Sequence, residues 1–166
     1  MPEAEVLYRE CVSGHKQKHG DYHPNTLTST YNLARVLHRG GKFNEAEALS
    51  MRILSAQTAT LGETRDNTLV TMNLLGLLRM DQGDHKEAET LFRKTLTLQR
   101  RQLGESHPDC LTTLKDLSSL LRITGRLDDA ESQCRKVCRV MEVKFGDGHP
   151  STLTTLGNLA LVLDSQ

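Results

Sequence analysis

The chain has 166 residues, and its 21 Lys and Arg residues balance its 21 Asp and Glu residues, so the formal net charge is zero. A neutral chain has no long-range field that attracts nucleic acid or an anionic membrane, so the charge argues against both partners. Aromatic residues make up only 4%, there is no Trp, and strong helix formers dominate between the turns, which favours an all-α protein.

The sequence also argues against a membrane or secreted protein. No apolar run approaches the roughly 20 residues that a membrane span needs, and the first residues lack the basic and apolar regions of a signal peptide. The cysteines show no disulfide-scaffold spacing in a chain long enough to hold a core without one. We therefore expect a cytoplasmic protein with four reduced thiols: Cys11, Cys110, Cys134 and Cys138.

A short motif recurs every 42 residues. The segment His23-Pro24-Asn25-Thr26-Leu27 returns at 107–111 and 149–153, with a degenerate copy at 65–69. Three glycines keep the same interval, and so do four Ala-Glu pairs. Self-similarity of this length predicts a stacked array of identical helical units, each burying its apolar face against the next. Such arrays commonly bind proteins, so we expect no enzyme. The recurring positions are Gly41, Gly83 and Gly125, and Ala4, Ala46, Ala88 and Ala130.

In chain order, the pattern predicts a helix over 2–19, then three units of helix, tight turn and longer helix, and a last helix over 150–164. The first helix of the first unit begins at the motif proline, Pro24, because proline is tolerated at the first helical position, and the recurring glycine then ends each first helix in a left-handed turn. The longer helices extend to about 60, 102 and 144. The predicted units are 1–20 (half repeat, second helix), 21–62, 63–104, 105–146 and 147–166 (half repeat, first helix), all within one repeat domain over 1–166.

Small residues on the two helices of a unit allow close packing. They are Ala34, Gly76, Ser118 and Ala160 on the first helices, in register with Ala46, Ala88 and Ala130 on the second.

These small residues, the turn glycine seven positions later and the alanine that follows resemble the tetratricopeptide repeat. The Leu-Gly-Glu-x-His-Pro-x-x-Leu junction at 103–111 and the period of 42 are similar to the kinesin light chain subtype. The resemblance covers essentially the whole chain and implies a right-handed superhelical solenoid of antiparallel helix pairs. The second repeat departs from the pattern at Arg65-Asp66, Arg79 and His85, and we expect it to pack less tightly or to be adapted for a contact.

The resemblance also implies a concave groove lined by the first helix of each unit. Cations outnumber acidic side chains at the groove positions, so an extended peptide with acidic and apolar residues is the expected partner, with Asn73 holding its backbone. The alternative is that these charges are solvated on an exposed face. The expected peptide-binding residues are Thr28, Tyr31, Arg35, His38, Arg39, Asn73, Leu77, Lys115, Ser119 and Arg122.

Other chemical sites are weaker candidates. The spacing by four of Cys11, His15, His19 and His23 offers zinc-ligand types on one helix face, but His23 belongs to the repeated motif and His19 occupies a slot that is Leu or Phe in the other repeats. We expect no metal, cofactor or catalytic residues, and we interpret the repeated histidines as structural.

Two function classes remain from the sequence. The first is a scaffold or adaptor that binds a partner peptide in its groove. The second is an assembly element, a fragment of a larger signalling or adaptor protein, which associates through its open ends. The last predicted helix supports this alternative, because it carries an apolar face that solenoids normally cover with a polar helix.

Overall fold

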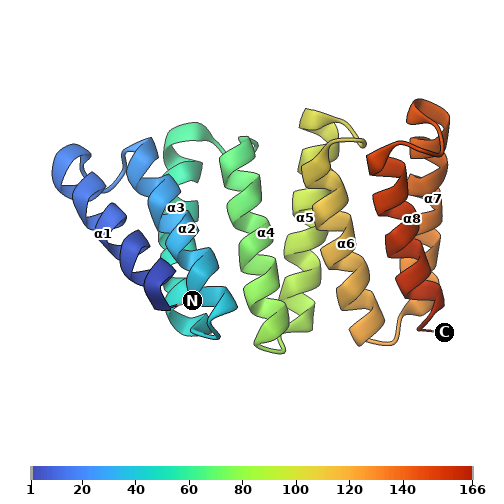
Figure 1. Cartoon of the computed structure of the whole chain (residues 1–166), viewed down its shortest axis with the longest axis horizontal. Coiled ribbons are helices and arrows are strands. Elements are labelled where there is room, and N and C mark those ends of the chain that lie inside the picture. Colours follow the sequence, from blue (N-terminus) through green and yellow to red (C-terminus); the bar gives the residue numbers. More distant parts are fainter. Residues whose placement is uncertain (1, 166) are drawn as a thin grey trace. The chain divides into compact units, whose positions relative to one another are not determined.

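The computed structural model describes residues 2–165, apart from the side chains of Pro2 and Leu61, and this part of the chain is all-α, without a β-strand (Figure 1). None of these helices combines the length and apolar character needed to cross a membrane. The helices are α1 (Pro2–His19), α2 (Pro24–Arg39), α3 (Phe43–Leu61), α4 (Asp66–Asp81), α5 (His85–Leu103), α6 (Pro108–Ile123), α7 (Leu127–Phe145) and α8 (Pro150–Leu163).

The chain divides into two compact units, Met1–Gly83 and Asp84–Gln166. In the first unit, α2 packs between α1 and α3, and α4 packs on α3 and touches α2. In the second unit, α6 packs on α5 and α7, and α8 packs on α7 and α6. Each unit is therefore a stack in which every packed pair of helices is adjacent, or next but one, along the chain.

The repeated histidine starts three of the helices. The Nδ1 atom of His23 accepts a hydrogen bond from the backbone N–H of Asn25 at 3.2 Å, and His107 and His149 do the same two residues on. This contact satisfies one of the backbone donors that a helix N-terminus leaves unpaired. The predicted structural role of these histidines is confirmed. Arg65, in the degenerate copy, makes no such side-chain bond.

A second repeated contact closes the loop before each of the helices α2, α4, α6 and α8. The Thr26 hydroxyl donates to the carbonyl oxygen of Gly20 at 2.8 Å. Thr68 and Thr152 repeat the bond six residues back, and Cys110 repeats it with its thiol, 3.2 Å from the Gly104 oxygen. The glycines that accept these bonds have φ between 82° and 88°, a left-handed conformation that favours glycine.

The predicted helix boundaries are accurate to one residue. Helices begin at Pro24, Pro108 and Pro150 as expected, while the longer helices end one residue later than expected and α8 ends at Leu163. The turn glycines Gly41 and Gly125 have φ of 74° and 75°, which confirms the predicted left-handed turns.

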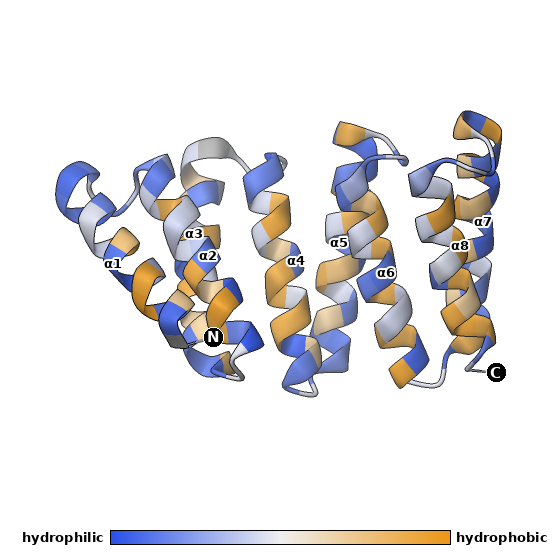
Figure 2. Ribbon diagram, in the orientation of Figure 1, coloured by the Kyte–Doolittle hydropathy of each residue, from blue (hydrophilic) through white to orange (hydrophobic). Residues whose placement is uncertain are grey.

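The predicted small residues of the helix pairs include several that are completely buried. Ala34 on α2 and Ala46 on α3 are completely buried, and so is Ala130 on α7. The Ser118 hydroxyl lies 3.3 Å from the Cys134 thiol, across α6 and α7. Larger core side chains flank these contacts, and the apolar residues of each helix therefore form a partial stripe along the ribbon (Figure 2).

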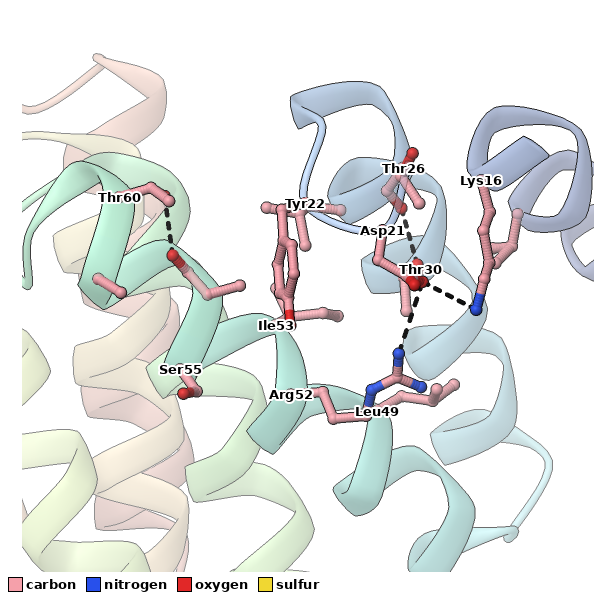
Figure 3. Close-up of a pocket in the computed structure, with 14 residues that line it drawn as sticks. Lys16, Asp21, Tyr22, Thr26, Thr30, Leu49, Arg52, Ile53, Ser55 and Thr60 are labelled. Carbon is pink, nitrogen blue, oxygen red and sulfur yellow. Dashed lines mark hydrogen bonds and ion pairs between the residues drawn. The ribbon is translucent and has the colours of Figure 1, made fainter. Parts of the chain in front are cut away.

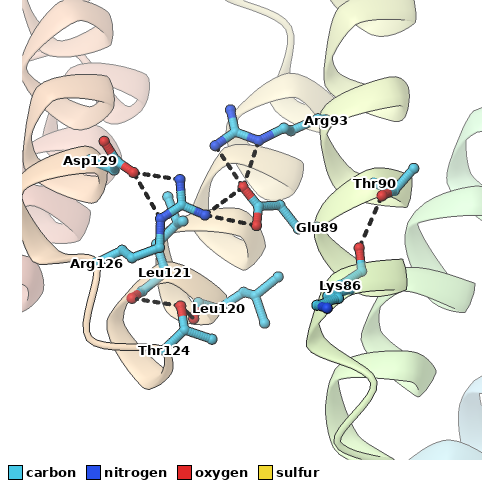
Figure 4. A network of polar contacts seen from close by, with 9 residues as sticks. All are labelled: Lys86, Glu89, Thr90, Arg93, Leu120, Leu121, Thr124, Arg126 and Asp129. Atoms are coloured by element: carbon cyan, nitrogen blue, oxygen red, sulfur yellow. Dashed lines mark hydrogen bonds and ion pairs between the residues drawn. The ribbon is translucent and has the colours of Figure 1, made fainter.

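Two of the Ala-Glu glutamates, Glu5 and Glu89, join their helix to the turn before a later helix of the same unit. Glu5 accepts from Lys42 at 2.8 Å in the first unit, and Glu89 accepts from Arg126 at 2.8 Å in the second (Figure 4). Arg93 also binds Glu89. Partial burial raises the pKa of Glu89, but hydrogen bonds from these two arginines lower it by more, so the net pKa lies below the ordinary carboxyl value.

Candidate functional site

The predicted groove positions of the first unit lie on two neighbouring first helices, α2 and α4. We call this surface the α2–α4 face. Its side chains differ in accessibility: Thr28, Arg35 and Arg39 are exposed, Tyr31, His38 and Leu77 are half-buried, and Asn73 is buried. The burial of Asn73 limits how far its amide can reach toward a peptide. The α2–α4 face therefore presents mainly its cations to a partner.

Two contacts organise the α2–α4 face. The guanidinium carbon of Arg35 lies 5.8 Å from the centre of the Tyr31 ring, within the range of a cation–π contact. The His38 ring Nε2 lies 2.6 Å from a carboxylate oxygen of Asp81, so this bond ties α2 to α4. Asp81 is therefore engaged by His38, and it does not neutralise Arg35 or Arg39.

The second unit places Lys115, Ser119 and Arg122 on α6, facing α8. We call this surface the α6–α8 face. A small depression of about 20 Å³ lies between the two helices, lined by these three side chains together with Asn158 and Leu161. That volume is close to the least space that holds one water molecule, so the depression fits a single polar group rather than a whole side chain.

Asn158 is the residue that sequence reasoning missed. Its side chain is 7% exposed, and its Nδ2 donor has no hydrogen-bond partner among the described residues. A buried donor that lacks an acceptor is costly unless a ligand or water supplies one. The sequence carried no pattern that marks this residue, because its burial depends on how α8 packs against α6 and α7.

All four predicted groove cations are exposed and have no carboxylate partner within residues 2–165: Arg35, Arg39, Lys115 and Arg122. Many of the other basic side chains form ion pairs, as Arg9, Arg79 and Arg135 do. Both faces therefore carry uncompensated positive charge, and the structure brings the site residues of each unit onto neighbouring helices.

The histidines of the first unit are engaged in packing. His15 lies 2.6 Å from the Ser29 hydroxyl, and the rings of His19 and His23 stack with their centres 4.4 Å apart. Phe145 and His149 stack in the same way at the corresponding positions of the second unit. Within residues 2–165, no three His, Cys, Asp or Glu side chains are placed to hold a metal ion together.

The sequence profile of the tetratricopeptide repeat matches residues 1–59, 29–79 and 67–142, which together cover most of the chain. The chain belongs to the tetratricopeptide repeat family. No curated protein matches it in sequence.

Solved structures of tetratricopeptide-like repeats have the same fold. Two of these structures contain TPR-like repeats that are nearly identical to one another, from a protein assigned as a kinesin light chain of Podosopora anserina. One of the two is a single-residue variant. The variant is 24% identical, with a TM-score of 0.85 over 99% of this chain and 77% of that chain. The other is 24% identical, with a TM-score of 0.83 over 99% and 78%. BtubC (BKLC) of P. vanneervenii is 20% identical, with a TM-score of 0.79 over 99% and 65%.

These similarities confirm the predicted solenoid fold and a tetratricopeptide array of the kinesin light chain type. Tetratricopeptide arrays belong to a class of non-catalytic scaffolds that bind other proteins. The chain is therefore a protein-protein interaction scaffold, and proteins are its class of partner.

Proposed function

We propose that the chain binds an extended acidic and apolar segment of a partner protein, and that the α6–α8 face is its principal contact. The observation that carries this proposal is the group formed by the Asn158 amide, Lys115 and Arg122. Among the residues that the structure describes, the amide is a buried donor without an acceptor, and the two exposed cations beside it have no carboxylate partner. A carboxylate of the partner would complement all three.

Physical chemistry favours such a ligand at this position. A hydrogen bond to an ionised group contributes more than one between neutral groups, about 1.5–3 kcal/mol. The depression accepts one polar group, and the half-exposed surface of α8 beside it, which includes Leu161, offers apolar contact to a neighbouring side chain. The α2–α4 face adds a second basic surface through Arg35 and Arg39, where further acidic residues would bind.

Random peptides displayed on phage provide a test that needs no known partner. We expect peptides selected on the immobilised chain to be enriched in Asp and Glu next to apolar residues. For a selected peptide, Lys115→Glu with Arg122→Glu should raise the Kd at least about tenfold, because one lost charge-assisted bond is sufficient for that factor.

The matched control reverses two exposed cations on α7, Lys136→Glu with Arg139→Glu, which makes the same change of net charge away from the α6–α8 face. This control should leave the Kd within about twofold. Equal losses in both variants would show that net charge alone acts, and unchanged binding in the Lys115 and Arg122 variant would refute the proposal.

One observation favours self-association as a second candidate. Leu153 and Leu161 on α8 are 55% and 60% exposed, although the residues at the register of Leu153 in earlier repeats are buried. An exposed apolar face of this kind is typical of interaction surfaces. Light scattering at increasing protein concentration should then show oligomers that Leu153→Glu abolishes, and a monomer at all concentrations would exclude this function.

The cytoplasmic location predicted from the sequence is part of the same proposal. Fractionation of cells that express a tagged chain would test it, since recovery in any other compartment would contradict it.

A further inference from the structure

The first unit contains a cavity of about 520 Å³ between α1 and α3 (Figure 3). Its buried floor includes Thr26 and Leu27 from α2 and Ile53 from α3. Val12 of α1 and Ala56 of α3 continue the apolar wall. None of the side chains of the α2–α4 face lines this cavity, so it is separate from the site proposed above.

Three wall positions of the cavity carry smaller residues than the later repeats do. At the register of Thr30, the later repeats have Met72, Leu114 and Leu156. At the register of Ala56 they have Leu98 and Val140, and at that of Ala59 they have Arg101 and Val143. The larger side chains would fill much of the space that the first repeat leaves open.

The mouth of the cavity is polar and carries an excess of positive charge. Lys16 Nζ lies 3.0 Å from a carboxylate oxygen of Asp21, and Arg52 Nη2 lies 3.7 Å from the same oxygen (Figure 3). Both cations are more than half exposed, at 53% and 67% of the side chain. Two cations thus share one carboxylate, and within the described part of the chain one positive charge at the mouth stays uncompensated.

We propose that this cavity is a second docking site, which receives a large apolar side chain from a partner protein while an adjacent carboxylate of that partner binds Lys16 and Arg52. The volume lies within the range of about 300–1,000 Å³ that is typical of ligand pockets, and the lining combines apolar walls with a few polar groups, as such pockets do. The uncompensated positive charge at the mouth favours an acidic segment as the occupant. Because tetratricopeptide repeats bind proteins, we expect that segment to be part of a polypeptide.

The probe is the peptide acetyl-Glu-Phe-Leu-Glu-amide, which carries large apolar side chains between two carboxylates. In a titration followed by two-dimensional NMR, we expect saturable shifts of the backbone amides of Val12, Tyr22, Ala56 and Ala59. The filled variant, Ala56→Leu with Ala59→Val, uses residues that later repeats carry at the same register. It should keep the helical fold and raise the Kd about tenfold or more, because binding requires the open space.

Charge is tested separately. The neutral peptide acetyl-Gln-Phe-Leu-Gln-amide, or the variant Arg52→Gln with the original peptide, should bind about threefold or more weakly, since each removes a charged partner at the mouth. In the variant Lys115→Glu with Arg122→Glu, the amides of the cavity residues should titrate with the same Kd as in the wild type, because neither substituted residue lines the cavity, whereas any shifts on the α6–α8 face should be lost. This control distinguishes a failure of the cavity proposal from a failure of the α6–α8 face.

Three results would overturn the proposal: shifts confined to residues outside the cavity, equal affinity in the wild type and the filled variant, or no binding of the peptide at millimolar concentration. Dodecanoate, a single-chain carboxylate, serves as the competing probe. If it binds in the cavity and the peptide does not, the site takes a small amphiphile and the docking of a protein segment is wrong.

Discussion

Replacing Cys110 with threonine should stabilise the protein, because it improves a repeated hydrogen bond. At this register Thr26, Thr68 and Thr152 donate from a hydroxyl to a glycine carbonyl at 2.8–3.0 Å, whereas the Cys110 thiol is 3.2 Å from the Gly104 oxygen. A thiol is a weak donor, while a hydroxyl bond contributes about 0.5–1.5 kcal/mol net. Burial raises the pKa of Cys110 to about 11, so the thiol stays protonated near neutral pH.

The control is Cys110→Val, which matches the shape of threonine but cannot donate. We expect the free energy of unfolding of the threonine variant to be about 1 kcal/mol higher than that of the valine variant. For a chain of this size, this difference corresponds to roughly 2–4 °C in melting temperature. Thermal unfolding followed by circular dichroism measures the difference. Because the two side chains have the same shape, a valine variant as stable as the threonine variant would refute the role of the bond.

Three further predictions concern the core, the ion pairs and the thiols. Leu121→Ala removes a fully buried side chain and should destabilise the chain by about 2–5 kcal/mol in urea unfolding, while a loss below about 1 kcal/mol would contradict its place in the core. Glu89→Gln should lower the free energy of unfolding by about 0.5 kcal/mol at pH 7. Because the folded pKa of Glu89 is lowered, the stability that its charge contributes is present above the unfolded pKa of about 4.3 and is lost as the pH falls through the folded value. The free energies of unfolding of the two proteins should therefore converge near pH 3. A difference in unfolding free energy that stays constant with pH would be inconsistent with this reasoning. Iodoacetamide at pH 8 should modify only Cys11, since the other three thiols are buried and burial raises their pKa, and a second adduct in the native mass spectrum would disprove this.

The period of 42 residues was sufficient to predict the helices and their order. Proline and glycine act locally, so the start at Pro24 and the turn at Gly41 follow from their own backbone preferences. The repeat also identified the Ala-Glu pairs, but not the reason for them. Glu89 binds Arg126 of the later turn, a contact that appears only when the helices stack.

The candidate sites were less predictable than the fold. Sequence reasoning placed cations such as Lys115 on a groove, but only coordinates could show that they have no carboxylate partner. Asn158 was missed because its burial depends on how α8 packs against α6 and α7. The cavity beside Arg52 was missed for a similar reason, since its walls come from three helices and a loop.

Helices within each unit touch only their near neighbours along the chain, and this has a consequence for the speed of folding. Short loops close on the order of 10–100 ns, so two consecutive helices meet before distant segments need to find each other. Helical proteins with such local contacts fold on the order of microseconds to milliseconds. Each unit should therefore spend little time with its leucines open to other molecules, and brief exposure of that kind limits aggregation during synthesis.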